Sequence, residues 1–211
     1  MTELADLVLR AHLDPRAATK ALAERLRAGG AELLFATEAA DPPQSDVVVD
    51  CRGLAARETV PALRGVRGEM LVLRCREVNL TRTLRLLHPR IPIYVVPRGE
   101  GVYMLGATMI ESASRSPASA RSLMELLSAV YALHPAFGEA EVVEIGVDAR
   151  PAFPDNLPRV WRDGDTIHVN GLYRHGFLLA PALARRAAAL AFGETLTPEE
   201  SDAHRLERQG A

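Results

Sequence analysis

An arginine-histidine pair between two glycines marks the stretch of this sequence whose residue types could perform chemistry. The pair is Arg174-His175, and the stretch runs from 171 to 181 with glycine at 171 and 176. Residues 166–169 before it favour a short strand, and the alanine-rich residues 182–190 after it favour a helix. The stretch is therefore expected to lie where a strand leads into a helix.

The chemistry available at such a junction is the binding of an anionic or carbonyl-bearing group. Gly171 and Gly176 permit tight backbone paths and let a ligand approach closely. The N-terminus of the following helix adds unpaired N–H groups and a partial positive charge, which favour such a ligand. The alternative is an ordinary strand-to-helix turn in which Arg174 and His175 are solvated surface groups.

The elements expected before residue 64 alternate between helix and strand. Asp14 can cap a helix that has Pro15 in its first turn and ends at Gly29-Gly30. Residues 31–35 are predicted to form a strand, and the β-branched run 47–49 a buried parallel strand. This rhythm is typical of an α/β layer.

The middle of the chain has a different pattern. Residues 70–73 and 93–96 are predicted strands, and Gly99-Glu100-Gly101 is a predicted hairpin turn into a strand at 102–107. A helix from 116 to 134 and a strand at 141–147 are predicted to follow. We therefore expect a mostly antiparallel sheet crossed by one helix.

Four further segments complete the expected organisation. We predict a short helix at 2–12, a turn at 41–44 and a capping box at 197–200 that opens a last helix. Residues 150–161 contain three prolines and are predicted to be rich in loops.

The composition excludes several classes of protein. With 211 residues, 48% of them hydrophobic, and a net charge of −2, the chain can bury a sizeable core but has no global field to attract nucleic acid or an anionic membrane. No run approaches the roughly 18 apolar residues of a membrane span, and the acidic N-terminus lacks the basic start of a signal peptide. The two cysteines favour a reducing cytoplasm over a disulfide scaffold, and Cys51 is interpreted as a small buried apolar residue.

Motifs for several other chemistries are missing from the sequence. The histidines are dispersed and show no metal-ligand spacing, so we predict no metal site. The sequence has neither a Gly-x-Ser-x-Gly elbow nor a Walker loop. Gly99-x-Gly101 is not a dinucleotide fingerprint, because no third glycine follows at the required offset.

The run Gly-Leu-Tyr-Arg-His-Gly-Phe-Leu-Leu-Ala-Pro at 171–181 resembles the C-terminal flavin motif of the glycine oxidase and D-amino-acid oxidase family. Within that family, the sequence is most similar to the FAD-dependent glycine oxidases of thiamine biosynthesis. The resemblance extends over nearly the whole chain through segments in the same order, which are 13–15, 47–53, 64–69, 94–98, 106–109 and 150–151.

The resemblance implies a fold and also shows two departures. It implies a mixed α/β fold in which a partial, Rossmann-like FAD-binding layer (1–63 and 149–211) holds an inserted, mostly antiparallel substrate domain (64–148). Family members open with a strand, a Gly-x-Gly-x-x-Gly turn and a helix that hold the FAD pyrophosphate, and this sequence has no such opening. Arg52 stands where the family has a small residue beside the flavin, which puts that contact in doubt.

The resemblance also implies roles for individual residues. The residues that match substrate-binding positions are Tyr94, Met109, Arg150 and Arg174. The residues that match the segment over the flavin ring are Gly171, Leu172, Tyr173, Arg174, His175, Gly176, Phe177 and Leu178. Without the resemblance, Arg150 could equally form a surface ion pair, Tyr94 be a half-buried strand aromatic, and Met109 fill the core.

A small amino acid presents a carboxylate, for which arginine supplies a fixed bidentate cation. No catalytic acid or base is implied, because in this family the α-hydrogen leaves as hydride to the flavin. His175 is therefore expected to be a loop histidine.

The expected function is FAD-dependent oxidation of glycine, or of a similar small amine such as sarcosine, to the imine with oxygen as the acceptor. Water would convert the imine to glyoxylate and ammonia, or a thiazole synthase partner would take it. The intact enzyme is expected to form a homo-oligomer. The alternatives are a truncated gene product that cannot hold FAD alone, and one half of a split enzyme that binds a separate flavin-binding subunit.

Overall fold

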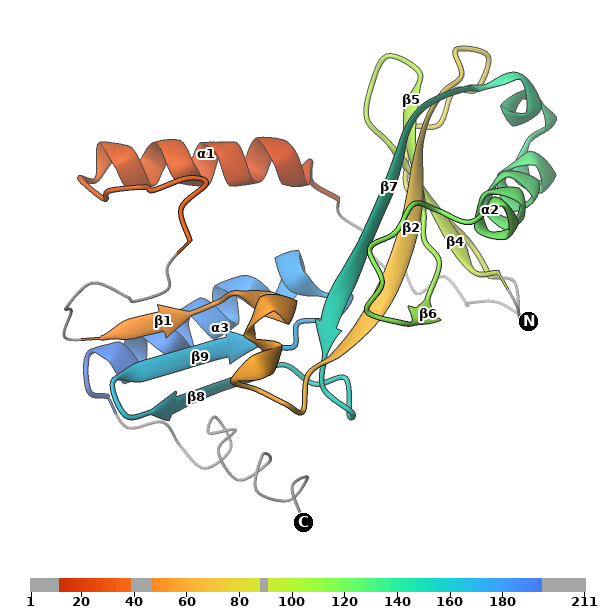
Figure 1. The fold of residues 1–211 in the computed structure, drawn as a ribbon. Coiled ribbons are helices and arrows are strands. Elements are labelled where there is room, and N and C mark those ends of the chain that lie inside the picture. The colour runs from red at the N-terminus through yellow and green to blue at the C-terminus, as the bar shows by residue number, and fades with distance from the viewer. Residues whose placement is uncertain (1–11, 39–46, 88–90, 195–211) are drawn as a thin grey trace, which may run out of the picture. The chain divides into compact units, whose positions relative to one another are not determined.

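The computed structural model describes residues 12–38, 47–87 and 91–194 (Figure 1). The predicted elements at 2–12, 41–44 and 197–200 fall outside these residues, apart from residue 12. The described elements are α1 (Pro15–Ala28), β1 (Val48–Asp50), η1 (Gly53–Glu58), β2 (Arg64–Arg74), β3 (Leu84–Leu86), β4 (Ile93–Pro97), β5 (Val102–Gly106), β6 (Ile110–Glu111), α2 (Ala120–Leu133), η2 (Pro135–Glu139), β7 (Glu141–Ala152), β8 (Arg159–Asp163), β9 (Thr166–Asn170) and α3 (Gly176–Ala191). The fold is mixed α/β, as the sequence predicted.

The chain divides into two compact units, each built from several stretches of sequence. The first unit takes the described residues up to Phe35 together with 69–108 and 117–147. The second unit takes 36–68, 109–116 and the described residues from Asp148 onward. The predicted domain boundaries, at 63/64 and 148/149, stay a prediction.

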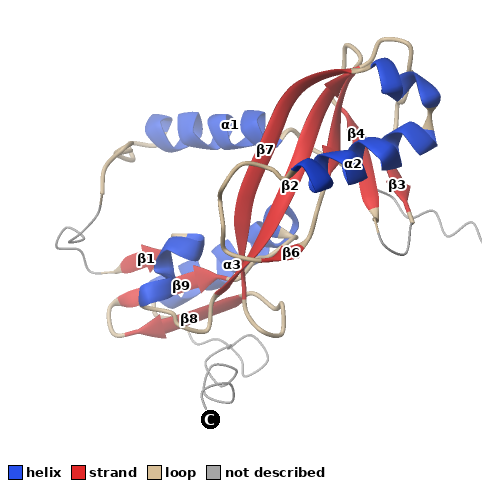
Figure 2. Ribbon diagram, turned by 45° about the vertical axis from the view of Figure 1, so that its right-hand side comes forward, coloured by secondary structure: helices blue, strands red, loops and turns tan. Residues whose placement is uncertain are grey.

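The first unit contains the predicted antiparallel sheet. Its strands follow the order β3-β4-β5-β2, and Leu105 of β5 pairs with both Val95 and Leu71. These three residues share a core with apolar residues of α2, which packs against β4 and β5 (Figure 2). The core is completed by a T-shaped contact between the rings of Tyr103 and Phe137, whose centroids are 5.4 Å apart.

The second unit contains a three-stranded sheet in the order β1-β9-β8. Strand β1 runs parallel to β9, and β8 is antiparallel to it. Helix α3 covers one face, where its Leu183 and Ala187 are buried against Val160 and Ile167 (Figure 1). This arrangement places the C-terminal end of β9 next to the residues that lead into α3.

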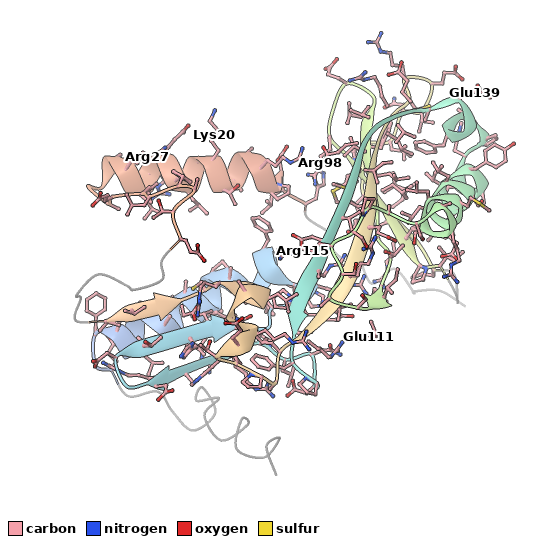
Figure 3. All side chains as sticks on the ribbon, in the orientation of Figure 1. Lys20, Arg27, Arg98, Glu111, Arg115 and Glu139 are labelled. Atoms are coloured by element: carbon pink, nitrogen blue, oxygen red, sulfur yellow. The ribbon has the colours of Figure 1, made fainter. Side chains whose placement is uncertain are left out.

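Helix α1 forms where the sequence predicted it. The carboxylate of Asp14 accepts hydrogen bonds from the amides of Arg16 and Ala17 (2.8 and 3.0 Å), and the cap at the other end is Gly29. Leu22 and Leu26 are nevertheless 56% and 52% exposed, and the helix has no buried residue. Its charged residues Lys20 and Arg27 are exposed (Figure 3).

The strand predicted at 31–35 is wrong. These residues adopt no regular structure, and the side chains of Leu34 and Phe35 are 70% and 66% exposed. The guanidinium of Arg27 lies 5.2 Å from the centre of the Phe35 ring, so this contact is with the end of α1. A strand needs a neighbouring ladder to satisfy its backbone, and among the described residues β1 pairs with β9 alone.

Three other predicted boundaries need correction. Helix α2 begins at Ala120 and not at 116, because the hydroxyl of Ser119 caps it by accepting from the amide of Ser122. The segment 150–161 is a loop only at 153–158, since β7 extends to Ala152 and β8 begins at Arg159. Helix α3 begins six residues before the predicted 182, at Gly176, and contains Pro181.

None of the helices among the described residues is long and apolar enough to cross a membrane.

Candidate functional site

Gly171 begins the strand-to-helix turn in a conformation that only glycine suits. Its φ is +78°, and a Cβ added there would lie 2.3 Å from Cδ2 of Phe153, which is fully buried. The preceding residue, Asn170, fixes the turn to the sheet. Its Oδ1 accepts from the amide of Gly171 (2.8 Å), and its Nδ2 donates to the carbonyl of Gly53 (2.9 Å).

The next residues of the turn lead into an open helix end. Tyr173 has a positive φ of 50° and its amide donates to the carbonyl of Pro151 at 3.1 Å. Helix α3 then starts at Gly176, and the side chain of its N-cap residue, His175, makes no capping hydrogen bond. The first-turn N–H groups of α3 therefore have no cap from the side chain of His175, an arrangement that suits a ligand oxygen.

Met109 lies against two residues of this turn. Its Sδ is 3.1 Å from Nη1 of Arg174 and 3.4 Å from Oη of Tyr173. Met109 is 47% exposed and therefore does not fill the core. The structure thus brings together two predicted substrate residues, Met109 and Arg174, with Tyr173 of the predicted flavin segment.

Arg150 is half-buried in β7 and lies against a glycine of β2. A Cβ added to Gly68 would be only 2.1 Å from Nη2 of Arg150. The bare backbone of Gly68 therefore makes room for the guanidinium. Sequence reasoning missed this role for Gly68, although the residue stands inside the segment 64–69 that carried part of the family resemblance.

Tyr94 is half-buried in β4 of the first unit. Its register partner on β5 is Gly106, where an added Cβ would lie 2.6 Å from the tyrosine Oη. The ring therefore crosses the neighbouring strand at a glycine. Because Tyr94 belongs to a different compact unit from Met109, Arg150 and Arg174, its part in a substrate site stays a prediction.

An apolar groove of about 590 Å³ lies within the second unit. One of its walls is the small-residue face of α3, and the other is formed by β1, β9 and the residues that follow them. The groove is lined by Val49, Cys51, Gly53, Pro151, Val169, Asn170, Leu172, Ala180, Leu183, Ala184, Ala187, Ala188 and Ala191. It can accept a flat apolar group next to the turn at Gly171.

The residues after β1 differ from expectation. Cys51 is exposed and lines the groove, so its prediction as a buried residue is wrong. Partial exclusion of water from the sulfur, and then the nearby Asp50 carboxylate, raise the pKa of the Cys51 thiol, which opposes thiolate formation.

Arg52 turns back onto the end of its own strand. Its Nε and Nη2 donate to Oδ1 and Oδ2 of Asp50 at 3.0 and 2.8 Å. This bidentate pair, helped by the Arg52 amide, holds the pKa of the buried Asp50 carboxyl below its usual value. The guanidinium of Arg52 is thereby held against Asp50.

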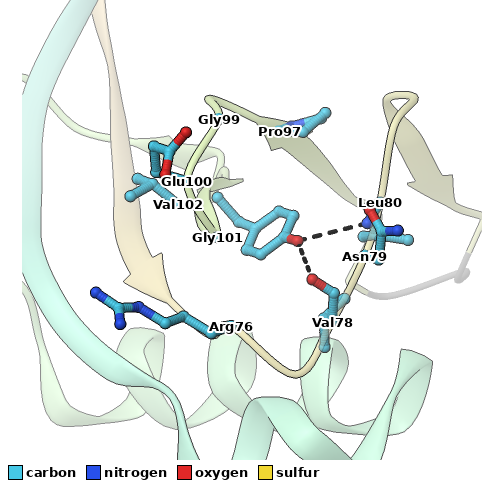
Figure 4. A pocket seen from close by; sticks show the side chains of 10 residues that line it. Arg76, Val78, Asn79, Leu80, Pro97, Gly99, Glu100, Gly101 and Val102 are labelled. Carbon is cyan, nitrogen blue, oxygen red and sulfur yellow. Dashed lines mark hydrogen bonds between the residues drawn. The ribbon is translucent and has the colours of Figure 1, made fainter.

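A second pocket, of about 620 Å³, lies within the first unit at the β4–β5 hairpin (Figure 4). The hydroxyl of Tyr103 donates to the carbonyl of Val78 and accepts from the amide of Leu80 at 3.4 Å. These bonds fasten the loop after β2 to the hairpin. None of the residues predicted to bind substrate or cofactor lines this pocket.

No group of three or more histidine, cysteine, aspartate or glutamate side chains that could hold a metal occurs in the part of the chain that the structure describes. The donors described at the turn before α3 are backbone amides and the guanidinium of Arg174. Such a donor set fits a flavin dinucleotide and a small carboxylate. Residues 171–178 would hold the flavin, because the turn is shaped by Gly171 and the N-terminus of α3 has no side-chain cap.

Comparison with known proteins shows the family of this chain. The family model described as FAD dependent oxidoreductase matches residues 7–190, and the chain belongs to this family. The chain is 57% identical over 189 residues to a Rhizobium etli protein named as a thiamine biosynthesis oxidoreductase, ThiO, covering 90% of this chain and 58% of that protein.

Two further comparisons agree with this family. A Synechocystis protein named bifunctional protein ThiO/ThiG is 29% identical over 163 residues, which are 74% of this chain and 24% of that protein. The crystal structure of glycine oxidase from Geobacillus kaustophilus superposes with a TM-score of 0.65 at 25% identity, covering 74% of this chain and 45% of that one. The chain therefore spans between a quarter and three fifths of the length of these proteins.

Proposed function

We propose that this chain supplies the substrate side and the flavin-ring side of an FAD-dependent oxidase that converts glycine, or a similarly small amine, to its imine. The observation that supports this most strongly is the cluster of Met109, Tyr173 and Arg174 on the glycine-shaped turn before α3. The similarity to ThiO and to glycine oxidase supports the choice of substrate class.

The side chains of the site would bind and orient the substrate. Arg150, seated on Gly68, and Arg174 are the cations that we assign to its carboxylate. Tyr94 and Met109 are assigned to the substrate pocket by the family resemblance. When bound, FAD would accept the two electrons and the α-hydrogen of the amine as a hydride, and oxygen would reoxidise it.

Orientation is the contribution that the protein makes to such a reaction. Holding a small substrate by its carboxylate fixes the α-carbon relative to the flavin and removes much of the entropic barrier. No side chain is required to act as acid or base. The product imine would be hydrolysed to glyoxylate and ammonia or passed to a thiazole synthase, a partner suggested by the ThiO/ThiG protein of Synechocystis.

The first test is whether the 211-residue chain holds FAD. The sequence has the ring-side segment but no Gly-x-Gly-x-x-Gly turn for the pyrophosphate. Each missing charge-assisted hydrogen bond is worth about 1.5–3 kcal/mol, so we expect the purified chain to bind FAD weakly. The measurement is a visible spectrum after incubation with FAD and gel filtration, and a yellow protein with stoichiometric flavin would contradict this expectation.

The decisive test uses a chimera in which this chain replaces the matching part of the Rhizobium etli relative. Glycine added without oxygen should bleach the visible flavin band, and air should restore it with release of hydrogen peroxide. Sarcosine, D-alanine and D-proline provide the comparison substrates. A chimera that retains FAD but is reduced by none of these amines would refute the proposed activity.

A further inference from the structure

Met109 makes an unusual contact for a half-exposed thioether. A guanidinium N–H of Arg174 and the hydroxyl of Tyr173 both approach its sulfur, at 3.1 and 3.4 Å. Thioether sulfur is a weak acceptor, whereas these two groups are strong donors. The contact therefore leaves most of the bonding capacity of the donors unused.

The other described methionines do not combine these features. Met124 is more exposed, at 67%, but has no donor on its sulfur. Met104 receives a contact from Arg98 at 3.5 Å but is only partly exposed, and Met70 is half-buried beside Gly146. Exposure to solvent and two strong donors coincide at Met109.

We propose that Met109 is a site of reversible oxidation to methionine sulfoxide, and that the sulfoxide oxygen binds the guanidinium of Arg174 and the hydroxyl of Tyr173. The oxidant is hydrogen peroxide. The sulfur lone pair attacks one peroxide oxygen, an S–O bond forms and the O–O bond breaks. The sulfur loses two electrons, and the other oxygen leaves with the two hydrogens of the peroxide as water.

The geometry favours the oxidised product because the donors are already in place. A sulfoxide oxygen carries a partial negative charge and accepts hydrogen bonds well, so it converts a weak contact with Arg174 into a charge-assisted hydrogen bond. The short turn from Gly171 to His175 holds both donors beside the sulfur through its backbone hydrogen bonds. Oxidation should therefore restrain Arg174.

A consequence for regulation rests on the proposed function. If Arg174 binds the substrate carboxylate, the sulfoxide competes with the substrate for the same guanidinium and raises KM. The proposed oxidase also produces hydrogen peroxide, so the modification would limit the enzyme in proportion to its own product.

The experiment does not depend on any oxidase activity. The purified chain is treated with dilute hydrogen peroxide, and peptide mass spectrometry measures the oxygen gained at Met109 and Met124. Phenylglyoxal, which modifies arginine side chains, then measures the accessibility of Arg174 before and after oxidation. We expect Met109 to be oxidised and the modification of Arg174 to fall severalfold, and methionine sulfoxide reductases should reverse both changes.

Two variants serve as controls. In Met109→Leu, which conserves volume and apolar character, peroxide should leave the reactivity of Arg174 unchanged. In Met124→Leu, protection of Arg174 should persist. The proposal is overturned if Met109 stays unmodified while Met124 is oxidised, or if Met109 is oxidised and Arg174 remains equally reactive. Both outcomes are measured on the unmutated chain and stay separate from the failure of glycine oxidation.

Discussion

The imidazole of His168 stacks on the indole of Trp161, with ring centroids 4.7 Å apart and planes inclined by 17°. The same imidazole presents Nδ1 at 3.6 Å from Oδ2 of the buried Asp50, whose other partner is Arg52. The three residues lie on the same face of neighbouring strands, since His168 is the register partner of both Asp50 and Trp161. The imidazole of His168 therefore contacts both the indole of Trp161 and the carboxylate of Asp50.

Trp161 fluorescence should report the stacking of His168. The sequence has a single tryptophan, so its emission arises from this site. His168→Ala removes the ring that covers one face of the half-buried indole, so water should reach that face and shift the emission maximum to longer wavelength. His168→Phe, which keeps an aromatic ring at this position, is the control, and an unchanged emission maximum in His168→Ala would contradict the stacking.

Asp50 should stabilise the second unit in a pH-dependent manner. Because Arg52 lowers the pKa of Asp50 in the folded state, its stabilising effect is complete above the unfolded carboxyl pKa of about 4 and is lost as the pH falls through the folded-state pKa. Thermal unfolding of Asp50→Asn should therefore lie below that of the unmodified chain at pH 6, and the difference should shrink toward pH 2. An equal difference at both ends of this range would argue against the ion pair as its cause.

Replacing Gly171 should be costly for two separable reasons. Gly171→Ala would place a left-handed alanine against the Phe153 ring, and strain plus overpacking should cost about 2–5 kcal/mol of unfolding free energy. Gly164→Ala is the matched control, because Gly164 has a φ of +56° but open space around it. It should cost about 1–2 kcal/mol. Urea unfolding measures the loss of unfolding free energy in both variants. Equal losses would mean that the contact with Phe153 is unimportant.

The contact between the Arg150 guanidinium and the backbone of Gly68 should determine the affinity for substrate in the chimera. Arg150→Ala should cost about 2–5 kcal/mol of carboxylate binding, because it removes one partner of a charge-assisted pair. Gly68→Ala should displace the guanidinium and raise KM for glycine, although Arg150 itself is retained. Gly29→Ala is the control, because Gly29 has a φ of −81° and an added Cβ would meet only ordinary contacts at 3.4 and 3.5 Å. Steady-state kinetics that show an unchanged KM in Gly68→Ala would separate Arg150 from the substrate.

Local signals predicted much of the fold. The Asp14-Pro15 cap and the hairpin at Gly99-Glu100-Gly101 act within a few residues, and each forms the predicted element. The β-branched run after residue 46 forms the predicted parallel strand, but its predicted burial is wrong, because Val49 is 47% exposed. The strand expected at 31–35 failed because pairing depends on a neighbour that local sequence does not reveal. Cys51 was misplaced for the same reason, since burial is decided by packing between distant segments.

The candidate site was only partly accessible to sequence reasoning. The need for glycine at 171 followed from the order of strand, glycine and helix, whereas the helix end at 176 did not, because the helix was predicted to begin at 182. The family resemblance assigned Met109 and Arg174 to one substrate pocket, but residue patterns alone could not predict their contact, because it joins segments more than sixty residues apart. The contribution of Gly68 was hidden because its importance lies in the space that it leaves for another side chain.

The parallel pairing of β1 with β9 has a consequence for synthesis of the protein. Val48 is in register with Thr166, so more than a hundred residues separate the two strands along the chain. Closing this loop costs roughly 2–3 kcal/mol more entropy than closing the β8–β9 hairpin. While the ribosome is still translating the middle of the chain, β1 has no β9 to pair with. The second unit can therefore assemble only late in translation, after the segment that also contains α3 has emerged.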